Sequence, residues 1–529
     1  MKCTQFWCIC GFILAVAAEA QVVEGLQEEQ GKFFIRGQVV DGATGAPVAR
    51  ARVSVDNGGP RSVLTSESGS FELSGLGERE YQLTVSRPGY VDGTRQAPND
   101  GTRVLVGPSR EGLVIRINRY AAVEVVVRDE HGEAVPGIPA VLYAESVEQG
   151  VRRLRQVRRL ETNDLGRARL YGLRPGKYML GTALGGYFTP FLGSYTSPSF
   201  PREGYAASMP VDPGEAEAGN WVAVGYGDEV ERVLTLRAEA VYDVHGRLSG
   251  IPLRPVPRLR LMRGGVDVGG SIGLNQNSGV FAIRDLPVGE YTVEAVKEGS
   301  MAVLGRANFV VSGETRGVQV RATPTAVLKG VGAGVEERGF MMQVISLDAG
   351  GWVQMATLGP NPPGGDRNEI APGRYAVSVN RQASRPRGVE QQDTPYVASI
   401  RVSGQDVLAK GLTVGEGGGE IIVEVETRPG AARLQVKADE MEAAWGVVAY
   451  RETADGPVFY EQSCAAGREC VMPQMPPGGY RVLGWRRDEP VAYRDPAVLD
   501  RVASRAVSVV LAERQTAEVE VKILEREEQ

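Results

Sequence analysis

One short stretch of the chain matches a motif of catalytic serines. Residues 269–273, Gly-Gly-Ser-Ile-Gly, fit the pattern Gly-x-Ser-x-Gly. In hydrolases this pattern places the serine on a strand-to-helix turn, with an acidic residue and a histidine later in the chain. Both histidines here, His131 and His245, precede Ser271, and the surrounding residues predict a Gly-rich hairpin. The sequence therefore disfavours serine hydrolase chemistry.

The same two histidines give little support to a metal site. Such a site needs three or four converging donors, and neither His131 nor His245 begins a His-x-x-Glu or His-x-x-x-His pair. We expect both in turns that follow a first strand. Among 65 acidic residues a pair of carboxylates suited to glycosidase chemistry is not excluded, but no stretch points to one. We predict no catalytic residue, no metal and no cofactor.

The first twenty residues have the features of a cleavable export signal. Lys2 precedes an apolar run over 6–18, which is shorter than the roughly 17 residues that span a bilayer. Ala-Glu-Ala at 18–20 offers a cleavage site before Gln21. An uncleaved anchor and a lipoprotein are the less favoured alternatives. No later segment is apolar enough to span a membrane, so we expect the mature chain to be exported, whether periplasmic, surface-associated or extracellular.

Removal of the signal leaves two cysteines, Cys464 and Cys470. Disulfides persist in oxidising compartments, and the two residues are expected across a short turn from each other. We predict a disulfide that closes this hairpin, with free thiols as the alternative. Metal ligation by the pair is not expected, because no histidine is near and the spacing matches no zinc site.

Two segments could bind a partner by charge or by aromatic faces. The net charge of −6 argues against a general nucleic-acid binder. Residues 151–160, VRRLRQVRRL, form an arginine strip that is either a solvated strand face or a docking strip for an acidic polymer. The arginines of the strip are Arg152, Arg153, Arg155, Arg158 and Arg159.

The second segment, residues 185–208, is rich in aromatic residues set among Gly, Ser and Pro, and shows no strand or helix period. We call it the aromatic loop. Its rings either fold back as a satellite cluster or stay exposed as flat faces for sugars or a protein partner. The candidate ligand-binding residues of this loop are Tyr187, Phe188, Phe191, Tyr195, Phe200 and Tyr205.

The elements that position these residues are strands of a repeated unit. An apolar residue, two turn-like residues, a Gly or charged residue, a variable residue and a Tyr recur five times. Pro and Gly favour a tight turn, and the Tyr opens a new strand with its ring inward and its hydroxyl free to reach a polar partner. The five copies end at Tyr81, Tyr178, Tyr291, Tyr375 and Tyr480.

A second, independent set of landmarks agrees with these five turns. Alternating apolar and polar runs, typical of half-buried strands, close each unit at 114–119, 232–237, 317–322, 420–426 and 518–524. Together the landmarks give units of about a hundred residues, a normal domain size. The 68 Gly and 31 Pro lie mainly between short β-runs, helix-period segments are scarce, and the best helix candidate, at 495–507, is short. The sequence predicts an all-β protein.

The first unit resembles a carboxypeptidase regulatory-like domain. The resemblance rests on residues 35–91, with a Gly-rich turn before PVARARVSV, the hairpin Thr65-x-x-x-Gly69-x-Phe71 and a Gly-Tyr pair at 89–90. It implies a prealbumin-like, seven-strand β-sandwich, a fold shared with starch-binding-type modules. Units two and three keep the glycine of the hairpin, whereas units four and five carry Pro363 and Arg468 in its place.

We therefore expect a tandem array of about five prealbumin-like, immunoglobulin-like antiparallel β-sandwich domains after a signal peptide. In carboxypeptidases that carry the regulatory domain, the zinc and catalytic residues lie in a separate domain, and nothing here resembles it. We predict a non-catalytic binding or structural protein, favouring a glycan or envelope polymer as ligand. A protein-interaction scaffold or adhesin-like spacer and an undetected hydrolase are the alternatives. The expected boundaries are 1–20 for the signal and 31–119, 120–237, 238–322, 323–426 and 427–529 for the domains.

Overall fold

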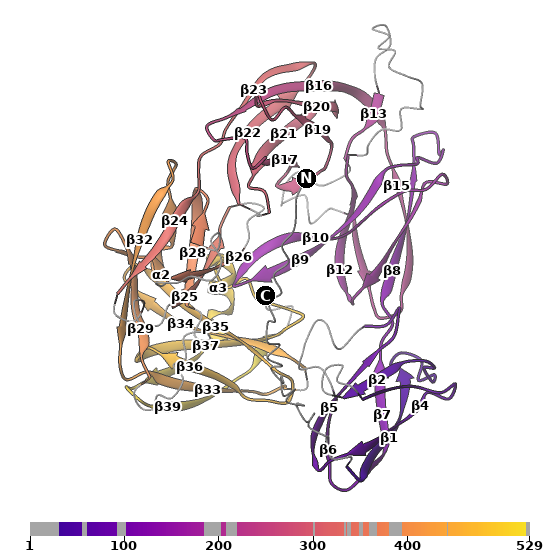
Figure 1. The fold of residues 1–529 in the computed structure, drawn as a ribbon, viewed down its shortest axis with the longest axis vertical. Helices are drawn as coiled ribbons and strands as arrows, with labels where there is room; N and C mark the ends of the chain where they lie inside the picture. Colours follow the sequence, from indigo (N-terminus) through magenta and orange to yellow (C-terminus); the bar gives the residue numbers. More distant parts are fainter. Residues whose placement is uncertain are drawn as a thin grey trace, which may run out of the picture. The chain divides into compact units, whose positions relative to one another are not determined.

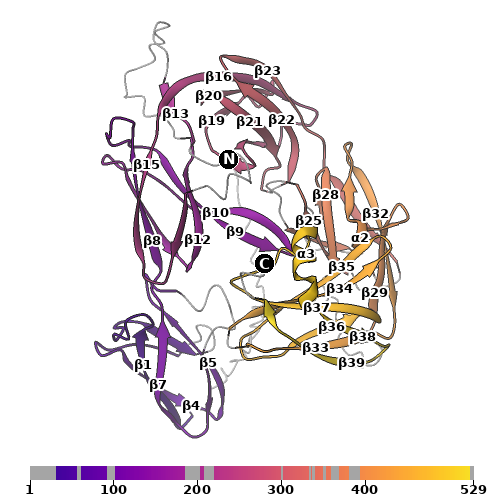
Figure 2. The same ribbon diagram turned by 180° about the vertical axis from the view of Figure 1, so that it is seen from behind.

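The computed structural model describes most of the chain as β-strands (Figures 1 and 2). It forms two compact units, Met1–Arg87 with Gly93–Ile117 and Pro88–Asp92 with Asn118–Gln529, and each is described by itself. The described residues are 31–55, 61–91, 102–184, 203–207, 220–299, 302–332, 335, 340–348, 353–358, 368–379, 394–441 and 443–524.

The first compact unit is a single β-sandwich, called the first sandwich, which has a smaller and a larger sheet. The smaller sheet has the order β4-β1-β7 and the larger one β3-β2-β5-β6. Inward-facing residues alternate with exposed ones along β4, so that Phe71, Leu73 and Leu76 are buried in the core. The strands are β1 (Phe33–Asp41), β2 (Arg52–Val55), β3 (Ser62–Leu64), β4 (Ser70–Leu76), β5 (Arg79–Ser86), β6 (Thr102–Val106) and β7 (Arg110–Ile117).

The second compact unit, Pro88–Asp92 with Asn118–Gln529, begins with the second and third sandwiches. In the second sandwich, β11-β8-β15 faces β10-β9-β12-β14, and in the third, the sheet of β13, β16, β19, β20 and β23 faces β18-β17-β21-β22. The strands of the second are β8 (Ala121–Arg128), β9 (Pro139–Glu148), β10 (Val151–Glu161), β11 (Arg167–Leu173), β12 (Gly176–Thr182), β14 (Trp221–Val224) and β15 (Glu229–Thr235). Those of the third are β13 (Glu203–Tyr205), β16 (Ala238–Ser249), β17 (Arg258–Arg263), β18 (Val266–Asp267), β19 (Ser271–Leu274), β20 (Val280–Pro287), β21 (Gly289–Val296), β22 (Val303–Val311) and β23 (Thr315–Arg321).

The fourth and fifth sandwiches complete the second unit. Sheet β27-β24-β32-β29-β30 pairs with β26-β25-β28-β31, and β36-β33-β39 pairs with the sheet of β34, β35, β37, β38 and β40. The elements of the fourth are β24 (Ala326–Val331), β25 (Phe340–Ser346), β26 (Val353–Leu358), β27 (Glu369–Ile370), β28 (Gly373–Val379), β29 (Tyr396–Val402), β30 (Gln405–Asp406), α2 (Val407–Lys410), β31 (Leu412–Val414) and β32 (Gly419–Arg428). Those of the fifth are β33 (Ala432–Ala438), β34 (Trp445–Thr453), β35 (Gly456–Cys464), β36 (Cys470–Met475), β37 (Gly478–Arg486), α3 (Pro496–Val502), β38 (Val507–Leu511), β39 (Thr516–Val521) and β40 (Ile523–Leu524).

The same strand pairing recurs in all five sandwiches. In each sandwich one strand runs parallel to a strand near the end of that sandwich's sequence and antiparallel to the strand that precedes the tyrosine turn. These strands are β1, β8, β16, β24 and β33, and their parallel partners are β7, β15, β23, β32 and β39. In the first sandwich the three strands are β1, β7 and β4, and in the fifth they are β33, β39 and β36. The predicted fold class, a tandem array of about five β-sandwiches, is therefore confirmed.

The five tyrosines of the recurring turn have the predicted placement. Each ring is buried in the core of its sandwich. Burial and the nearby Asp348 raise the pKa of Tyr375 to about 12, which keeps its hydroxyl protonated as a donor. Four hydroxyls donate to the carbonyl four residues earlier, and that of Tyr81 accepts from the N–H of Gly77 at 2.9 Å. The motif recurs because each hydroxyl satisfies a backbone group of the turn that enters its own strand.

The helix candidate at the C-terminal end also forms. Helix α3 begins after Asp495, whose side chain accepts the N–H of Ala497 at 2.9 Å, and Pro496 occupies its first turn. The helix is shorter than the predicted segment because residues 503–505 continue as a 3₁₀ turn.

Candidate functional site

The arginine strip forms strand β10, which pairs with β9 in a long antiparallel hairpin (Figure 1). Two of its arginines reach acidic residues of β9. Arg152 lies 2.9 Å from a carboxylate oxygen of Glu145, and Arg155 lies 2.9 Å from one of Glu148. These pairs are cross-strand contacts of the kind that stabilise a hairpin.

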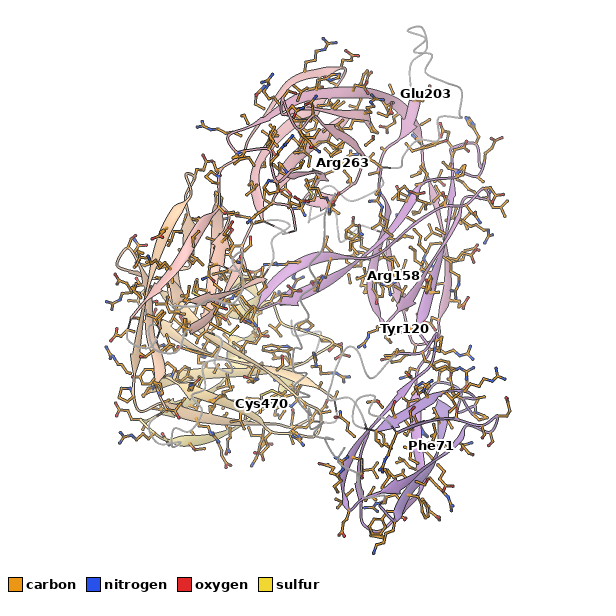
Figure 3. The ribbon with its side chains drawn as sticks, viewed as in Figure 1. Phe71, Tyr120, Arg158, Glu203, Arg263 and Cys470 are labelled. Carbon is orange, nitrogen blue, oxygen red and sulfur yellow. A yellow bond between two sulfur atoms is a disulfide. The ribbon has the colours of Figure 1, made fainter. Side chains whose placement is uncertain are left out.

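Two further arginines of the strip hydrogen-bond backbone carbonyls. Arg158, labelled in Figure 3, donates to the carbonyls of Tyr171 at 2.7 Å and Gly172 at 2.9 Å. Arg153 donates to the carbonyl of Ser346 in the fourth sandwich at 2.6 Å. The positive charge of Arg159 acts to lower the pKa of Tyr143, although burial, the largest influence, together with Asp267 raises that pKa well above its ordinary value. Docking of an acidic polymer on this strip stays a prediction, and it would have to compete with these contacts.

The tip of the hairpin makes contacts that the sequence did not predict. Arg494, which precedes α3 in the fifth sandwich, donates its N–H to the carbonyl of Gly150 at 3.1 Å and its Nε to that of Gln149 at 2.8 Å. The hydroxyl oxygen of Ser378, in the fourth sandwich, lies 3.5 Å from the amide oxygen of Gln149. The second sandwich thus contacts sandwiches that are distant in sequence, which no pattern along the chain revealed.

Most of the aromatic loop lies outside the described residues, namely Tyr187, Phe188, Phe191, Tyr195 and Phe200. Tyr205 is described and is half-buried. It ends β13, which pairs with Ala238–Ala240 of β16, so the expectation that the loop has no strand was wrong for residues 203–205. The short strand forms because the exposed first residues of β16 extend beyond its pairing with β20.

Leu184, which directly precedes the aromatic loop, and Ala207, near the end of the loop, are both attached to the third sandwich. Before the loop, Leu184 donates its N–H to the carbonyl of Val268 at 2.8 Å and is buried in the core of the third sandwich. After the loop's strand, Ala207 belongs to the same core. Both ends of the loop are therefore attached to the third sandwich.

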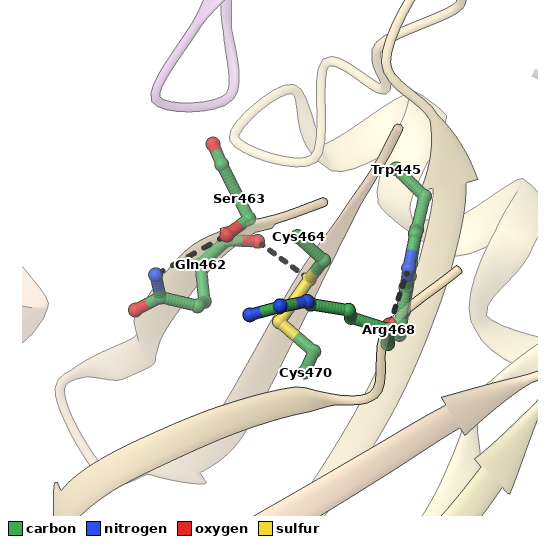
Figure 4. Close-up of a disulfide and its surroundings, with 6 residues drawn as sticks. All are labelled: Trp445, Gln462, Ser463, Cys464, Arg468 and Cys470. Atoms are coloured by element: carbon green, nitrogen blue, oxygen red, sulfur yellow. Dashed lines mark hydrogen bonds between the residues drawn. A yellow bond between two sulfur atoms is a disulfide. The ribbon is translucent and has the colours of Figure 1, made fainter. Parts of the chain in front are cut away.

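Cys464 and Cys470 form the predicted disulfide, shown in Figure 4. The bond does not close a hairpin, because β35 pairs with β34 whereas β36 pairs with β33. It links the larger sheet of the fifth sandwich to the smaller one, with both cysteines buried in the core. The indole N–H of Trp445 donates to the carbonyl of Arg468 at 3.3 Å and holds the connecting segment beside the disulfide.

Ser271, His131 and His245 do not have the structural setting that the catalytic motifs require. Ser271 is the exposed first residue of β19, a strand with no helix after it. His131 lies in an exposed turn, as expected, whereas His245 lies within β16 opposite Ala282 because β16 extends through the predicted turn. Within the described ranges, no group of three or more His, Cys, Asp or Glu residues could hold a metal ion. No helix in those ranges is long and apolar enough to cross a membrane.

Comparison with known proteins supports the resemblance seen in the first unit. Residues 35–106 match the model of the carboxypeptidase regulatory-like domain, and this stretch is such a domain. No curated protein matches the chain.

Several solved structures are similar to the chain at low identity. The Bacillus anthracis TIE protein is 14% identical over 55% of this chain, with a TM-score of 0.18, and the match spans half of that protein's length. A streptococcal ancillary pilin is 13% identical over 55% of this chain and 99% of its own, with a TM-score of 0.18. GBS52, a minor pilin of Streptococcus agalactiae, is 14% identical over 39% of this chain and 96% of its own, with a TM-score of 0.21. Similarities of this size leave the function open.

Proposed function

We propose that this protein is an exported, non-catalytic array of β-sandwiches that presents the aromatic loop to a carbohydrate or envelope polymer. The observation that carries the proposal is the attachment of both ends of the loop to the third sandwich, through Leu184 and through β13 with Ala207. Binding residues are often found on loops that a rigid scaffold positions. The domain boundaries predicted from the sequence and the export signal at 1–20 are part of this proposal.

Two further observations support the proposal. The disulfide between Cys464 and Cys470 suits an oxidising compartment outside the cytoplasm. Four arginines of the strip contact groups of the same chain, which leaves the aromatic loop as the stronger of the two binding candidates. Aromatic faces can bind neutral sugars with little dependence on salt, because screening acts on charges.

Binding to a glycan and cell-wall-polymer array tests the proposal. The mature chain, residues 21–529, would be applied at low and moderate salt. We expect binding to a neutral glycan that resists salt and that falls at least tenfold in the variant Tyr187→Ala/Phe191→Ala/Tyr195→Ala. The matched control is Tyr171→Ala, which removes an exposed tyrosine of β11 outside the loop. A blank array, or equal loss in both variants, would contradict the proposal.

A protein-interaction scaffold is the second candidate function. The packing of the larger sheet of the second sandwich against the third sandwich favours it. The outer face of the larger sheet in the second sandwich packs Val141, Tyr143 and Met179 against Val266 of the third. Sandwich faces of this chain can therefore act as docking surfaces for other sandwiches.

On the glycan and cell-wall-polymer array, salt-sensitive binding to acidic polymers would instead point to the arginine strip as the binding site.

A further inference from the structure

The fifth sandwich carries an aromatic cluster on the outer face of its larger sheet. The cluster contains Tyr450, Phe459, Trp485 and Tyr493, all of them buried, and includes apolar residues of α3. The ring centroids of Phe459 and Tyr493 lie 4.9 Å apart, and those of Trp485 and Tyr493 lie 5.9 Å apart. The guanidinium of Arg494 lies 5.0 Å from the Phe459 centroid, within cation–π range.

The tip of the β9–β10 hairpin fits against this cluster through a glycine. Gly150 has a φ of +76°, and a Cβ built on it would lie 2.4 Å from the ring of Tyr493. Any larger residue there would clash with a ring that the cluster holds in place. Val147 of β9 packs against the same cluster, and Arg494 binds the carbonyls of Gln149 and Gly150 as described above.

This contact is built from Val147, the glycine at the hairpin tip and the hydrogen bonds of Arg494. No core residue of the second sandwich belongs to the aromatic cluster, and Val147 joins it only as a partly buried side chain. Separation of the hairpin tip from the cluster would therefore remove no residue from the core of the second sandwich. Opening would expose part of the Tyr493 and Phe459 rings.

We propose that the aromatic cluster of the fifth sandwich is a binding site for a Gln-Gly β-turn, and that the chain's own β9–β10 hairpin occupies it as a reversible latch. The closed latch holds the second sandwich to the fourth and fifth, and the open latch exposes an aromatic docking surface. This inference goes beyond the proposed function, because it concerns a contact that involves neither the aromatic loop nor a glycan.

Hydrogen exchange of the mature chain tests the latch, with the backbone N–H of Arg494 as the probe because it donates to Gly150. The variant Gly150→Val is expected to raise the exchange rate of this amide at least tenfold. The control is Gly132→Val, since Gly132 also has a positive φ, +84°, but a Cβ there meets nothing within 4 Å. Exchange in β33 and β36 should be equal in both variants, which shows that the fifth sandwich stays folded.

A second variant separates loss of the latch from a badly folded hairpin. Arg494→Ala keeps the hairpin sequence intact, and we expect faster exchange of the amides at 149–151 with no change in β8 and β11. Unchanged exchange at Arg494 in Gly150→Val would overturn the proposal. Protection of Arg494 that disappears on dilution of the wild type would also overturn it, because the hairpin would then come from a second copy of the chain.

Discussion

The fourth and fifth sandwiches share one hydrophobic core, whereas the second and third have separate cores. The shared core extends from Ala326 in β24 to Val521 in β39. Among the described residues, the second and third sandwiches are joined by a small separate cluster around Tyr143, whose hydroxyl donates to the carbonyl of Asp267 at 3.1 Å, and by the segment at Leu184. Domains of the same fold are thus joined in two ways in one chain.

A short helix in the fourth sandwich accounts for part of the difference. Helix α2 begins after Asp406, whose side chain accepts the N–H of Leu408 at 3.0 Å, and it contacts β28 and β29 as well as β35 of the fifth sandwich. Val407 and Leu408 are buried in the shared core. Continuous apolar packing predicts that the two sandwiches unfold together, whereas small or polar contacts predict separate unfolding.

The largest expected effect comes from breaking the shared core at Leu408. The variant Leu408→Ala should lower the free energy of unfolding by about 2–5 kcal/mol and should speed hydrogen exchange in β24 and β33 together. The control is Ile283→Ala in β20, buried in the separate core of the third sandwich. Its effect, of similar size, should stay within that sandwich. If the hydrogen-exchange rates of the β33 amides were the same in Leu408→Ala and the wild type, the two sandwiches would be shown to unfold independently.

The disulfide provides the next test of the shared core. The double variant Cys464→Ala/Cys470→Ala should cost roughly 2–4 kcal/mol, because the unfolded chain loses a covalent constraint. The measurement is urea unfolding monitored by hydrogen exchange of individual strands. If the core is shared, the unfolding midpoint should fall for β24 of the fourth sandwich as well as for β33 of the fifth. The third sandwich serves as the internal reference and should not shift.

The tyrosine turns give a smaller and matched pair of changes. Tyr375→Phe and Tyr291→Phe each remove one hydroxyl and leave a buried carbonyl without its donor, that of Ala371 and that of Pro287. Each should cost about 1–3 kcal/mol. We expect Tyr375→Phe to affect the fourth and fifth sandwiches and Tyr291→Phe the third alone. Hydrogen exchange measures which sandwiches each variant affects. If each variant affected its own sandwich alone, or if both also affected a neighbouring sandwich, the shared core and the separate core would not differ in this respect.

The join between the third and fourth sandwiches is expected to respond to pH. Lys297 lies 2.6 Å from a carboxylate oxygen of Glu369, and Thr325 donates to the same oxygen. Burial acts to raise the pKa of Glu369, but the hydrogen bonds from Lys297 and Thr325 and the charge of Lys297 outweigh it and hold the pKa below its ordinary value of 4.5.

A carboxylate with a lowered pKa stabilises the fold above its ordinary pKa and loses this contribution as the pH falls. The stability difference between wild type and Glu369→Gln should therefore shrink between pH 6 and pH 3, by less than about 1 kcal/mol for a partly exposed pair. Urea unfolding at both pH values measures it. A difference that is constant with pH would show that the ion pair does not stabilise this join.

Much of the fold of each sandwich could be predicted from the sequence because its signals are local. The tyrosine turns depend on residues within five positions of one another, and each hydroxyl reaches a backbone group four residues away. The strand alternation and the cap at Asp495 are local in the same way. The pairing of Cys464 with Cys470 was also accessible, because they are the only cysteines that follow Cys10 in the sequence.

The candidate site was less accessible to sequence reasoning. The arginines of 151–160 stood out as a charge run, but their partners Glu145, Ser346 and Tyr171 come from different strands and different sandwiches. The glycine at the hairpin tip looked like any turn glycine, since nothing nearby in the sequence indicates Tyr493.

The sequence by itself determined the type of the unit, its approximate number of copies and the turn chemistry that closes each copy, because strand period and turn residues act over a few positions. Only the tertiary structure decided that two sandwiches share a core, that the disulfide links two sheets and that Gly150 meets Tyr493. These contacts join residues far apart in the chain, and they depend on which faces of finished sandwiches fit together.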